Sequence, residues 1–333
     1  MKLLVTGGSG FIGSNFIHYI LDTYPNYEVI NLDSLTYAGC EMTNDCVRDN
    51  PRYKFVKGDI CDPVIVDSLV AQVDAIVHFA AESHVDNSIT NSMIFVMTNV
   101  MGTHTLIEAA RRHGNKRFHH VSTDEVFGHL GPNDAPFHEG TAHHPRSPYS
   151  ASKAASDHLV MSYFYTHGLP VTISNCSNNY GPRQFPEKLI PLFVTNLLQG
   201  KKVPVYGDGL NVRDWIHVQD HNRAVDQILH HGQMGHTYCV GSNNEKNNME
   251  ITKLILSNLG FGEEMIQFVE DRKGHDRRYA INNTKVCQTF NWKPEISFET
   301  GIHETIDWYK KNDDWWKKIL SKEYQNINTK YDQ

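Results

Sequence analysis

Short apolar runs alternate with longer amphipathic stretches through the first half of the chain. The apolar runs predict buried β-strands, and they lie at 2–6, 28–32, 53–56, 75–79 and 118–121. The amphipathic stretches predict helices, and they lie at 11–21, 63–71, 92–113 and 150–167. Strands that alternate with helices pair in parallel through right-handed crossovers. The pattern therefore predicts an α/β fold with a doubly wound parallel sheet.

The pattern becomes irregular in the second half. Prolines and glycines interrupt short apolar runs throughout 184–222, which predicts a smaller and less regular lobe. An amphipathic stretch at 219–231 then predicts a helix like those of the first half. We therefore expect one domain over residues 1–175, rejoined by about 212–240, and an interleaved C-terminal lobe over residues 176–333.

The bulk composition excludes several classes of function. Of the 333 residues, 40% are hydrophobic and 21% are charged, and the formal net charge is -7. A negative chain does not bind nucleic acid or an anionic membrane over its whole surface, although a local cationic pocket can still hold an anionic small molecule. No apolar run approaches the roughly 18 residues of a membrane span. We expect no nucleic-acid partner and no membrane partner.

The cysteines and histidines are scattered. The six cysteines include no Cys-x-x-Cys pair, and the adjacent pairs among the 20 histidines lack the spacing of helical metal ligands. No secretory signal precedes the first predicted strand. This cysteine usage fits reduced thiols better than a disulfide framework. We expect a cytoplasmic protein without a metal.

A glycine-rich loop follows the first predicted strand and opens the first predicted helix. Gly8, Gly10 and Gly13 permit a tight turn, close approach of the backbone to a pyrophosphate and close packing of helix on strand. Gly7, Gly10 and Gly13 also fit the three-spaced variant, and the new helix offers free N–H groups to an anion. Asp33 ends the next strand, where a carboxylate accepts hydrogen bonds from the adenosine ribose and repels a phosphate on it. The spacing predicts a Rossmann-type site that favours NAD over NADP.

Two adjacent carboxylates follow the strand predicted at 118–121. Strand side chains alternate between faces, so Asp124 and Glu125 share a pocket only if the backbone leaves the extended form there. Ligands bind in the crevice at the carboxyl ends of parallel strands. Thr123, Asp124 and Glu125 therefore form a candidate catalytic set of a hydroxyl, an acid and a base. Helix capping is the alternative interpretation, because threonine and aspartate are both good capping residues.

Tyr149 and Lys153 stand four residues apart at the start of the helix predicted at 150–167, so their side chains share one helix face. A nearby ammonium group favours phenolate and lowers the pKa of the tyrosine. Tyr149 can then take a proton from a substrate alcohol near neutral pH, while Lys153 also reaches the nicotinamide ribose. We interpret the pair as the proton-transfer residues of an alcohol oxidation.

Several motifs together resemble the extended short-chain dehydrogenases/reductases. They are the glycine loop, 80–86, Ser122-Thr123-Asp124-Glu125-Val126, Tyr149 to Lys153, 177–182, 186–191, 212–215 and 274–280. Within that superfamily the chain is most similar to the dTDP-glucose 4,6-dehydratases of the NAD-dependent epimerase/dehydratase family, because sugar epimerases lack the carboxylate pair. The resemblance implies a lyase of deoxysugar biosynthesis that dehydrates dTDP-glucose to dTDP-4-keto-6-deoxyglucose with NAD as cofactor.

The resemblance also assigns the steps of the reaction. Tyr149 deprotonates the hydroxyl on carbon 4 of the hexose while hydride passes to NAD, and Thr123 holds the forming carbonyl oxygen. Glu125 removes the proton from carbon 5 as Asp124 protonates the hydroxyl that leaves carbon 6. The hydride then returns to carbon 6. Elimination needs an acid and a base at once, so we expect Asp124 protonated and Glu125 ionised.

Binding residues carry over by the same resemblance. The cofactor residues are Gly7, Gly10, Phe11, Ile12, Gly13, Asp33, Ser34, Leu35, Thr36, Asp59, Ile60, Phe79, Ala80, Ala81, Ser83, Thr98, Tyr149, Lys153 and Asn179. The substrate residues are Ser83, Thr123, Asn178, Glu187, Lys188, Leu189, Pro204, Val205, Tyr206, Arg213, Asn248, Asp271, Arg272 and His275. The first domain thus holds NAD and the second lobe the nucleotide-diphosphate hexose. Family members dimerise through the segments at 92–113 and 150–167, which implies a homodimer.

Other functions stay open at this point. The same reaction on UDP-glucose needs only a different nucleobase pocket. A nucleotide-sugar 4-epimerase uses NAD, Thr123, Tyr149 and Lys153 but gives Asp124 no role, and a decarboxylase of nucleotide-sugar acids needs no acid at carbon 6. A non-enzymatic NAD-binding module needs neither Tyr149 nor Lys153, and both are present. The motifs do not fix the downstream pathway.

Overall fold

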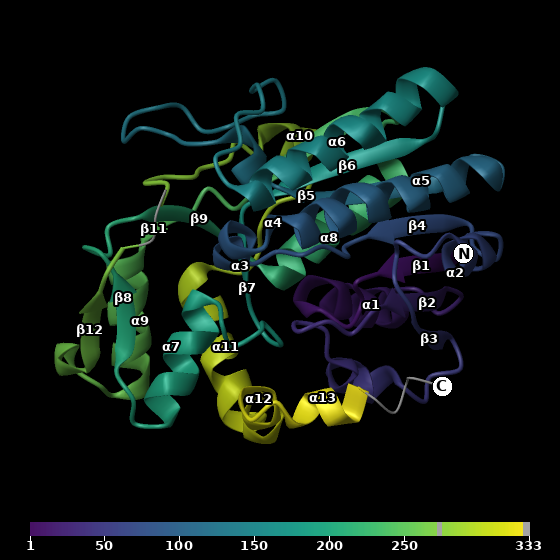
Figure 1. Ribbon diagram of the computed structural model, residues 1–333. Helices are drawn as coiled ribbons and strands as arrows, with labels where there is room; N and C mark the ends of the chain where they lie inside the picture. The colour runs from purple at the N-terminus through teal and green to yellow at the C-terminus, as the bar shows by residue number, and fades with distance from the viewer. Residues whose placement is uncertain (272–274, 329–333) are drawn as a thin grey trace.

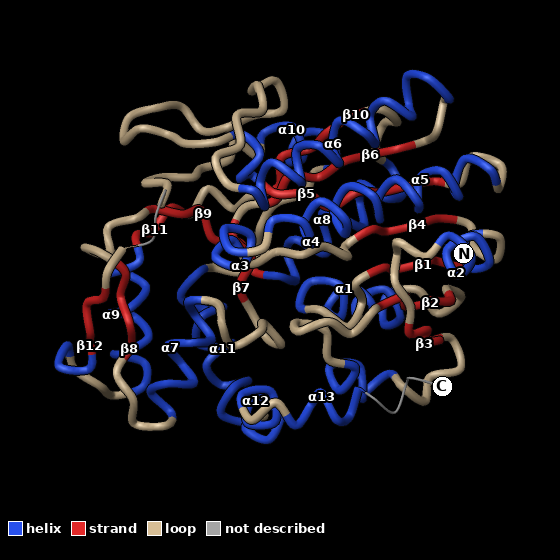
Figure 2. Tube along the Cα trace, in the orientation of Figure 1, coloured by secondary structure: helices blue, strands red, loops and turns tan. Residues whose placement is uncertain are grey.

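The computed structural model describes residues 1–271 and 275–328, with side chains described as far as residue 325. Its centre is a seven-stranded sheet with the order β10-β6-β5-β4-β1-β2-β3, in which every pairing is parallel (Figures 1 and 2). The strands are β1 (Lys2–Thr6), β2 (Glu28–Asp33), β3 (Tyr53–Lys57), β4 (Ala75–His78), β5 (Arg117–Thr123), β6 (Val171–Cys176) and β10 (His236–Val240). The predicted α/β doubly wound sheet is confirmed.

Helices cover both faces of this sheet, so most residues of its inner strands are buried, including polar ones such as His119, His120 and Asn175. One layer contains α2 (Pro63–Val70), α5 (Thr103–Arg112) and α6 (Pro148–His167), and the other contains α1 (Phe11–Thr23), α8 (Val218–His231) and α10 (Thr284–Phe290). Successive residues of β1 point to opposite faces of the sheet. Leu4 packs in the core beneath α2, α5 and α6, and Leu3 packs in the core beneath α1 and α8. Each such leucine contributes about 1.5–3 kcal/mol on full burial.

The segment predicted as a helix over 92–113 is helical over 92–112, and its middle forms a π-turn that the prediction did not include. It consists of α4 (Ser92–Phe95), a π-helical turn η2 (Val96–Gly102) and α5, and a short helix α3 (Val85–Thr90) precedes it. The wide turn carries Asn99 into the interior, where its amide donates to Glu82 O at 3.0 Å and to Ser152 Oγ at 2.8 Å. A local π-turn of this kind often lies beside a functional site.

The second lobe has its own sheets, helices and core. A three-stranded sheet contains β7 (Asn178–Tyr180), β9 (Val212–His217) and β11 (Glu245–Asn247), and a two-stranded sheet pairs β8 (Val203–Tyr206) with β12 (Ile266–Val269). Around them lie α7 (Leu189–Leu198), α9 (Asn248–Leu259), α11 (Phe298–Lys311) and α12 (Asp313–Leu320). Between these elements the chain returns to the large sheet as α8 and β10. The domain boundaries given above remain predictions.

The last described helix, α13 (Glu323–Asn328), reaches back from the second lobe to the first. Figure 1 shows α12 and α13 below the sheet, leading toward β3. Tyr324 donates its hydroxyl proton to Tyr37 O at 2.6 Å and packs with Cys40 and Ile319. The short 3-10 helices are η1 (Glu41–Val47), η3 (Asp124–Phe127) and η4 (Glu263–Met265). Among the described helices, none has both the length and the apolar character that crossing a membrane requires.

Candidate active site

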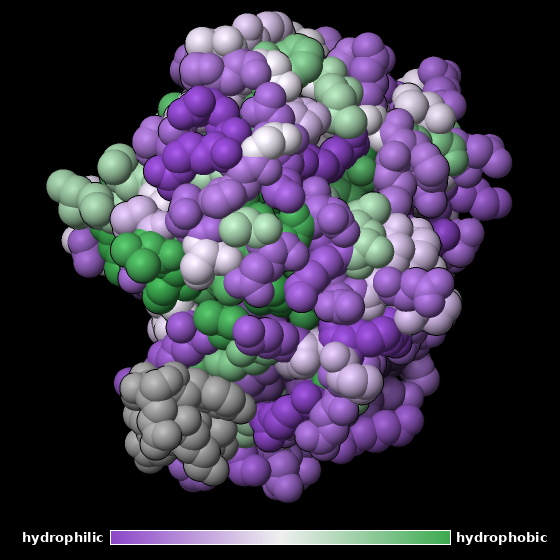
Figure 3. All heavy atoms as spheres, turned by 90° about the vertical axis from the view of Figure 1, so that its right-hand side faces the viewer, coloured by the Kyte–Doolittle hydropathy of each residue, from purple (hydrophilic) through white to green (hydrophobic). Residues whose placement is uncertain are grey.

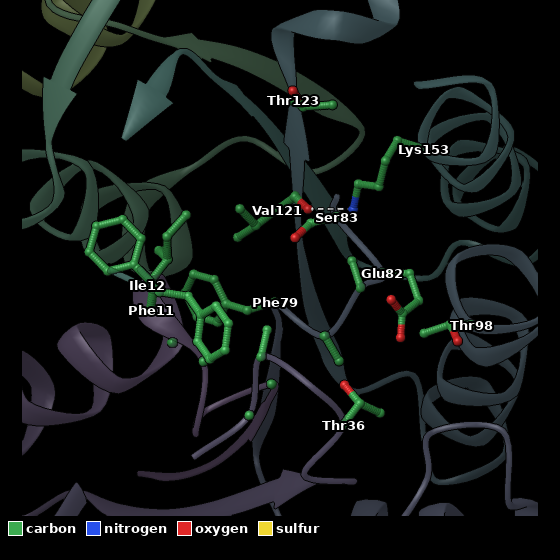
Figure 4. Close-up of a pocket in the computed structure, with 18 of the residues that line it drawn as sticks. Phe11, Ile12, Thr36, Phe79, Glu82, Ser83, Thr98, Val121, Thr123 and Lys153 are labelled. Atoms are coloured by element: carbon green, nitrogen blue, oxygen red, sulfur yellow. Dashed lines mark hydrogen bonds between the residues drawn. The ribbon is translucent and has the colours of Figure 1, made fainter. Parts of the chain in front are cut away.

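A cavity of about 520 Å³ runs along the carboxyl ends of the central strands and reaches the first elements of the second lobe. In Figure 4, Thr123 and Lys153 lie toward one end of it and Thr36 toward the other. It is lined by nearly all of the predicted cofactor residues, namely Gly7, Gly10, Phe11, Ile12, Gly13, Asp33, Ser34, Thr36, Asp59, Ile60, Phe79, Ala80, Ala81, Ser83, Thr98, Tyr149, Lys153 and Asn179. Leu35 is the exception, since its buried side chain does not line the cavity.

The glycine loop is shaped by close backbone packing. Gly7 has a φ of 70°, and a Cβ on it would lie 2.6 Å from Ala80 N, while a Cβ on Gly13 would lie 2.4 Å from Gly7 O. Helix α1 begins after Gly10, which offers no capping side chain, and the first turn contains no acidic residue. The N–H groups of this turn therefore remain available to an anion. These features fit the pyrophosphate of a dinucleotide.

Asp33 is 8% exposed and meets two backbone N–H groups. Its Oδ2 accepts from Ser9 N at 2.9 Å and its Oδ1 accepts from Leu35 N at 2.8 Å. Burial raises the pKa of this carboxyl, and the two N–H donors oppose the rise. Leu35 has a left-handed φ of 53°, so the chain turns sharply directly after it has donated its N–H to the carboxylate. The neighbouring residues that line the cavity up to Gly39 include no cation, which suits a ribose without a phosphate.

The Thr-Asp-Glu triplet stands where β5 ends and η3 begins. Thr123 is the last strand residue, and its Oγ1 accepts from Glu125 N at 3.3 Å, so it caps η3. All three residues line the cavity. The capping and catalytic interpretations are therefore compatible, because the cap is what turns Asp124 and Glu125 out of the alternating strand pattern into one site.

Asp124 is 2% exposed, and neighbouring groups give its carboxyl few hydrogen bonds. Its Oδ1 accepts from Thr123 Oγ1 at 3.4 Å, and its Oδ2 has no hydrogen-bond partner among the described residues. Burial raises the pKa of Asp124 well above its usual range, and the charges of Glu125 and Asp214 raise it further, whereas Arg213 lowers it. The geometry therefore favours a carboxylic acid that keeps its proton.

Tyr149 and Lys153 both face the cavity from the first two turns of α6. Lys153 Nζ donates to Val121 O at 2.8 Å, the contact drawn as a dashed line in Figure 4. Burial, followed by the charge of Glu125, raises the pKa of Tyr149 well above its usual range. The structure thus gives the opposite direction from the predicted lowering, because desolvation and nearby carboxylates act against phenolate.

The predicted substrate residues divide into two groups. Ser83, Thr123, Asn178, Glu187 and Lys188 line the cavity. The others that can be placed lie outside its lining, and they are Leu189, Pro204, Val205, Tyr206, Arg213, Asn248, Asp271 and His275. Arg272 lies outside the described residues. The structure therefore places the first group in the cavity with the predicted catalytic residues, and from the second group Arg213 lies near enough for its charge to lower the pKa of Asp124.

Part of the second group forms its own cluster in the second lobe. His275 Nδ1 lies 2.7 Å from Asp271 Oδ1, and its ring meets that of Tyr206 edge-on at 6.4 Å between centroids. Arg213 is 7% exposed, and its guanidinium lies 4.3 Å from the centroid of the Tyr279 ring and donates to Asp276 O at 3.0 Å. Val205 packs inside the core of the lobe. This cluster comes from β8, β9 and the chain after β12.

Several lining residues were missed from the sequence. They are Leu32, Ala38, Gly39, Gly58, Cys61, Ile94, Met97, Val121, Ser122, Cys176, Ser177, Gln184 and Phe185, whereas Glu82 lies within the range 79–83 that the resemblance assigned to the cofactor. Ser122 and Ser177 directly adjoin the predicted residues Thr123 and Asn178, so their position at strand ends was a usable signal. Ile94 and Met97 belong to the helical segment that contains the π-turn, and Phe185 belongs to an irregular loop, where periodicity gives no signal. Across the ranges 1–271 and 275–328, no three His, Cys, Asp or Glu residues form a group able to hold a metal ion.

A doubly wound sheet that brings a glycine loop, a Tyr-x-x-x-Lys pair and two carboxylates to one cavity defines an extended short-chain dehydrogenase/reductase. Known proteins agree with this class. The family model described as GDP-mannose 4,6 dehydratase matches residues 4–305. A dTDP-glucose 4,6-dehydratase from Streptomyces antibioticus is 51% identical over 324 residues, which cover 96% of this chain and 95% of that protein.

Solved structures give the same answer. A dTDP-glucose 4,6-dehydratase from Bacillus anthracis, solved in complex with NAD, is 50% identical with a TM-score of 0.90, covering 96% of this chain and 99% of that one. Its counterpart from Streptomyces venezuelae, solved with NAD bound, is 48% identical with a TM-score of 0.93, covering 96% and 100%. The chain belongs to the dTDP-glucose 4,6-dehydratase family, as its motifs predicted.

Proposed function

We propose that this protein catalyses the NAD-dependent dehydration of dTDP-glucose to dTDP-4-keto-6-deoxyglucose. The observation that carries the proposal is the buried Asp124, whose Oδ2 has no hydrogen-bond partner in the described chain, directly beside Glu125. Both acids share a cavity with Tyr149 and Lys153. Relatives named dTDP-glucose 4,6-dehydratase support the choice of reaction and of nucleotide.

The glycine loop and Asp33 make one end of the cavity suitable for the adenosine diphosphate part of NAD. The uncapped first turn of α1 suits the pyrophosphate, and Asp33 suits an adenosine ribose without a phosphate. The other predicted cofactor residues that line the cavity lie between these points and Lys153. NAD, when bound, accepts hydride from carbon 4 of the sugar and gives it back at carbon 6.

The oxidation step falls to Tyr149, Thr123 and Lys153. Tyr149 takes the proton of the hydroxyl on carbon 4, and Thr123 Oγ1 donates a hydrogen bond to the oxygen as it becomes a carbonyl. Lys153 is held by Val121 O at 2.8 Å, so its ammonium stays between strand β5 and the cavity. The ketone formed at carbon 4 acidifies the proton on carbon 5.

The elimination step falls to the paired acids. Glu125 removes the proton from carbon 5, and Asp124 gives its proton to the hydroxyl that leaves carbon 6 as water. Burial and the charge of Glu125 raise the pKa of Asp124 well above its usual range, which favours the protonated form that a general acid needs. We assign Ser83, Asn178, Glu187 and Lys188 to the sugar and its diphosphate, because they line the same cavity.

A nucleotide-sugar 4-epimerase is the second candidate function. It would use Thr123, Tyr149 and Lys153 as they stand, but it would leave a buried acid beside the reacting carbon without a task. The raised pKa of Asp124 favours the dehydratase, since epimerisation at carbon 4 needs no proton donor at carbon 6.

The deciding experiment incubates the purified protein with dTDP-glucose and analyses the product by mass spectrometry and nucleotide-sugar chromatography. We expect the loss of one water, a 4-keto-6-deoxy sugar and no net formation of NADH. A parallel reaction with UDP-glucose determines the nucleotide specificity, and we expect the faster reaction with dTDP-glucose. An isomeric galactose product with unchanged mass would overturn the proposal.

We also assign a homodimer to this protein. The surface in Figure 3 is largely polar, with hydrophobic side chains gathered toward one side of the view. Exposed apolar side chains are concentrated on α3, α4 and η2, namely Ile89, Met93, Ile94, Val96, Met97 and Met101. Ile94 and Met97 line the cavity, and the exposed side chains Ile89, Met93, Val96 and Met101 on the same short stretch of chain support an interface there. Light scattering on Met93→Lys/Met101→Lys should report a monomer, and Val64→Lys on α2 should remain a dimer. A dimeric double variant would exclude this face.

We also propose that the protein is cytoplasmic. All six cysteines are free, and none has a partner thiol at disulfide distance. Reduced thiols in a chain of this size fit a reducing compartment. Cell fractionation with an antibody to the native protein tests this, and recovery in a secreted or membrane fraction would contradict it.

A further inference from the structure

We propose that Asp157 is a positioning residue of this active site, which ties the end of strand β5 to β6 and acts as the counter-charge of Lys153. Asp157 is 2% exposed and stands one helical turn after Lys153 on α6. It does not line the cavity. The inference rests on the proposed function only for its kinetic readout.

The first part of the inference concerns the strand end. Asp157 Oδ2 accepts from Ser122 Oγ at 2.9 Å and from Asn175 Nδ2 at 3.1 Å. The same Asn175 amide donates to Thr123 O at 3.1 Å. One carboxylate oxygen thus anchors β5 and β6 at the position immediately before Asp124. Hydrogen bonds to a charged acceptor are the stronger kind, so this anchor limits the freedom of the triplet.

The second part concerns Lys153. Residues four apart on a helix are neighbours, which places the carboxylate of Asp157 beside the lysine side chain. Burial lowers the pKa of Lys153, and the charge of Asp157 is the largest effect that opposes this. Lys153 in turn lowers the pKa of Asp157, which burial raises. The two side chains are buried one turn apart on α6, and each shifts the pKa of the other through its charge.

The other groups around this pair carry no compensating charge at neutral pH. From β4 and β5, His78 and His120 have pKa values well below the usual range because of burial. From β6, burial raises the pKa of Cys176 to about 12. His120 Nε2 lies 3.2 Å from Asp157 Oδ1 without making a hydrogen bond to it.

One further group faces the carboxylate from outside the sheet. His143 lies in the loop between η3 and α6, and burial lowers its pKa as well. Asp157 is therefore the group whose charge sustains the ammonium form of Lys153. Loss of that charge lowers the pKa of Lys153, so the ammonium form is lost at a lower pH.

The test is Asp157→Asn, compared with the parent enzyme over the full pH range. The alkaline limb of the kcat profile should move to lower pH by about one unit or more, since an opposite charge within about 4–6 Å shifts a pKa by about 1–3 units. Ser122→Ala is the matched control, because it removes a hydrogen bond to the same oxygen and leaves the charge. The alkaline limb of the kcat profile of Ser122→Ala should stay at the pH of the parent enzyme. An unmoved limb in Asp157→Asn would overturn the counter-charge role.

Two additions keep the test decisive. The affinity for NAD, measured by calorimetry against pH, reports on Lys153 without any sugar. We expect its alkaline decline to shift in Asp157→Asn, so a failure of the proposed reaction is distinguishable from a failure of this inference. If Asp157→Asn does not fold, Asn175→Ala removes only the link from Asp157 to Thr123. It should lower kcat several-fold at every pH, and an unchanged kcat would overturn the anchoring role.

Discussion

Asp33 and Asp124 stand at the carboxyl ends of β2 and β5 in the same sheet, with β1 and β4 between them, and both are almost inaccessible, yet their surroundings differ. Asp33, the last residue of β2, accepts backbone N–H bonds of 2.9 Å and 2.8 Å on its two oxygens. Asp124, after β5, has one long contact of 3.4 Å, and its second oxygen has no hydrogen-bond partner in the described chain. Burial raises both pKa values, but that of Asp124 rises well above its usual range.

The difference corresponds to the two tasks. A carboxylate that must accept hydrogen bonds from a ribose benefits from N–H donors that favour its ionised form. A carboxylic acid that must deliver a proton benefits from the absence of donors and from a neighbouring negative charge, here Glu125. The same residue type at the same kind of strand end therefore acquires opposite protonation preferences from its partners.

The largest expected effect is on catalysis at Asp124. Asp124→Asn should lower the rate of dehydration by about 10²–10⁴, the usual contribution of a general acid. Oxidation at carbon 4 should continue, so reduced nicotinamide should accumulate on the enzyme and be visible by absorbance in rapid mixing. Asp33→Asn, measured at saturating NAD, is the matched control, and its rate of elimination should equal that of the parent enzyme. Full dehydration by Asp124→Asn would refute the acid assignment.

The next effect is on cofactor affinity at Asp33. Asp33→Asn should weaken NAD binding by about 10- to 100-fold, because hydrogen bonds to a charged group contribute about 1.5–3 kcal/mol. The new amide also places N–H groups against the N–H of Ser9 or Leu35. Calorimetry on the cofactor-free protein measures this. Asp124→Asn should bind NAD as the parent does, and equal losses in both variants would remove the distinction between the two sites.

The smallest expected effect is on stability. The pKa of Asp124 is higher in the folded protein than in the unfolded chain, so its protonation stabilises the fold. This contribution is complete below the unfolded-state pKa and is lost as the pH rises through the folded-state pKa. Asp124→Asn should therefore match the parent near pH ~3, below the usual aspartate pKa of about 3.9. It should then have the higher Tm near neutral pH. Calorimetric scans at several pH values measure this, and a Tm difference that does not change with pH would contradict it.

The predicted parts of this site are those encoded by local spacing. The loop from Gly7 to Gly13, the triplet at 123–125 and the pair Tyr149 and Lys153 each occupy one turn or one strand end, so nearby residues determine their geometry. The alternation of strands and helices likewise predicts the doubly wound parallel sheet, because it follows from patterns within short segments.

The missed parts depend on contacts between distant segments. The π-turn at η2 follows from Asn99, whose partners include Ser152 on another helix. The direction of the Tyr149 pKa follows from burial and from Glu125, which spacing along α6 does not reveal. The role inferred for Asp157 depends on Ser122 and Asn175, which lie 35 and 18 residues away. Periodicity describes which face a residue occupies, not which residues that face meets.

The bond from Tyr324 to Tyr37 has a consequence for the order of biosynthesis. The two residues are separated by 287 positions, and Tyr37 lies among loop residues that line the cofactor cavity. During translation the glycine loop and Asp33 emerge early, whereas the hydroxyl that anchors this loop appears only when α13 has been made. Nascent chains stalled before Tyr324 should therefore retain NAD for shorter times than chains stalled beyond α13, a difference that labelled cofactor on isolated ribosomes would measure.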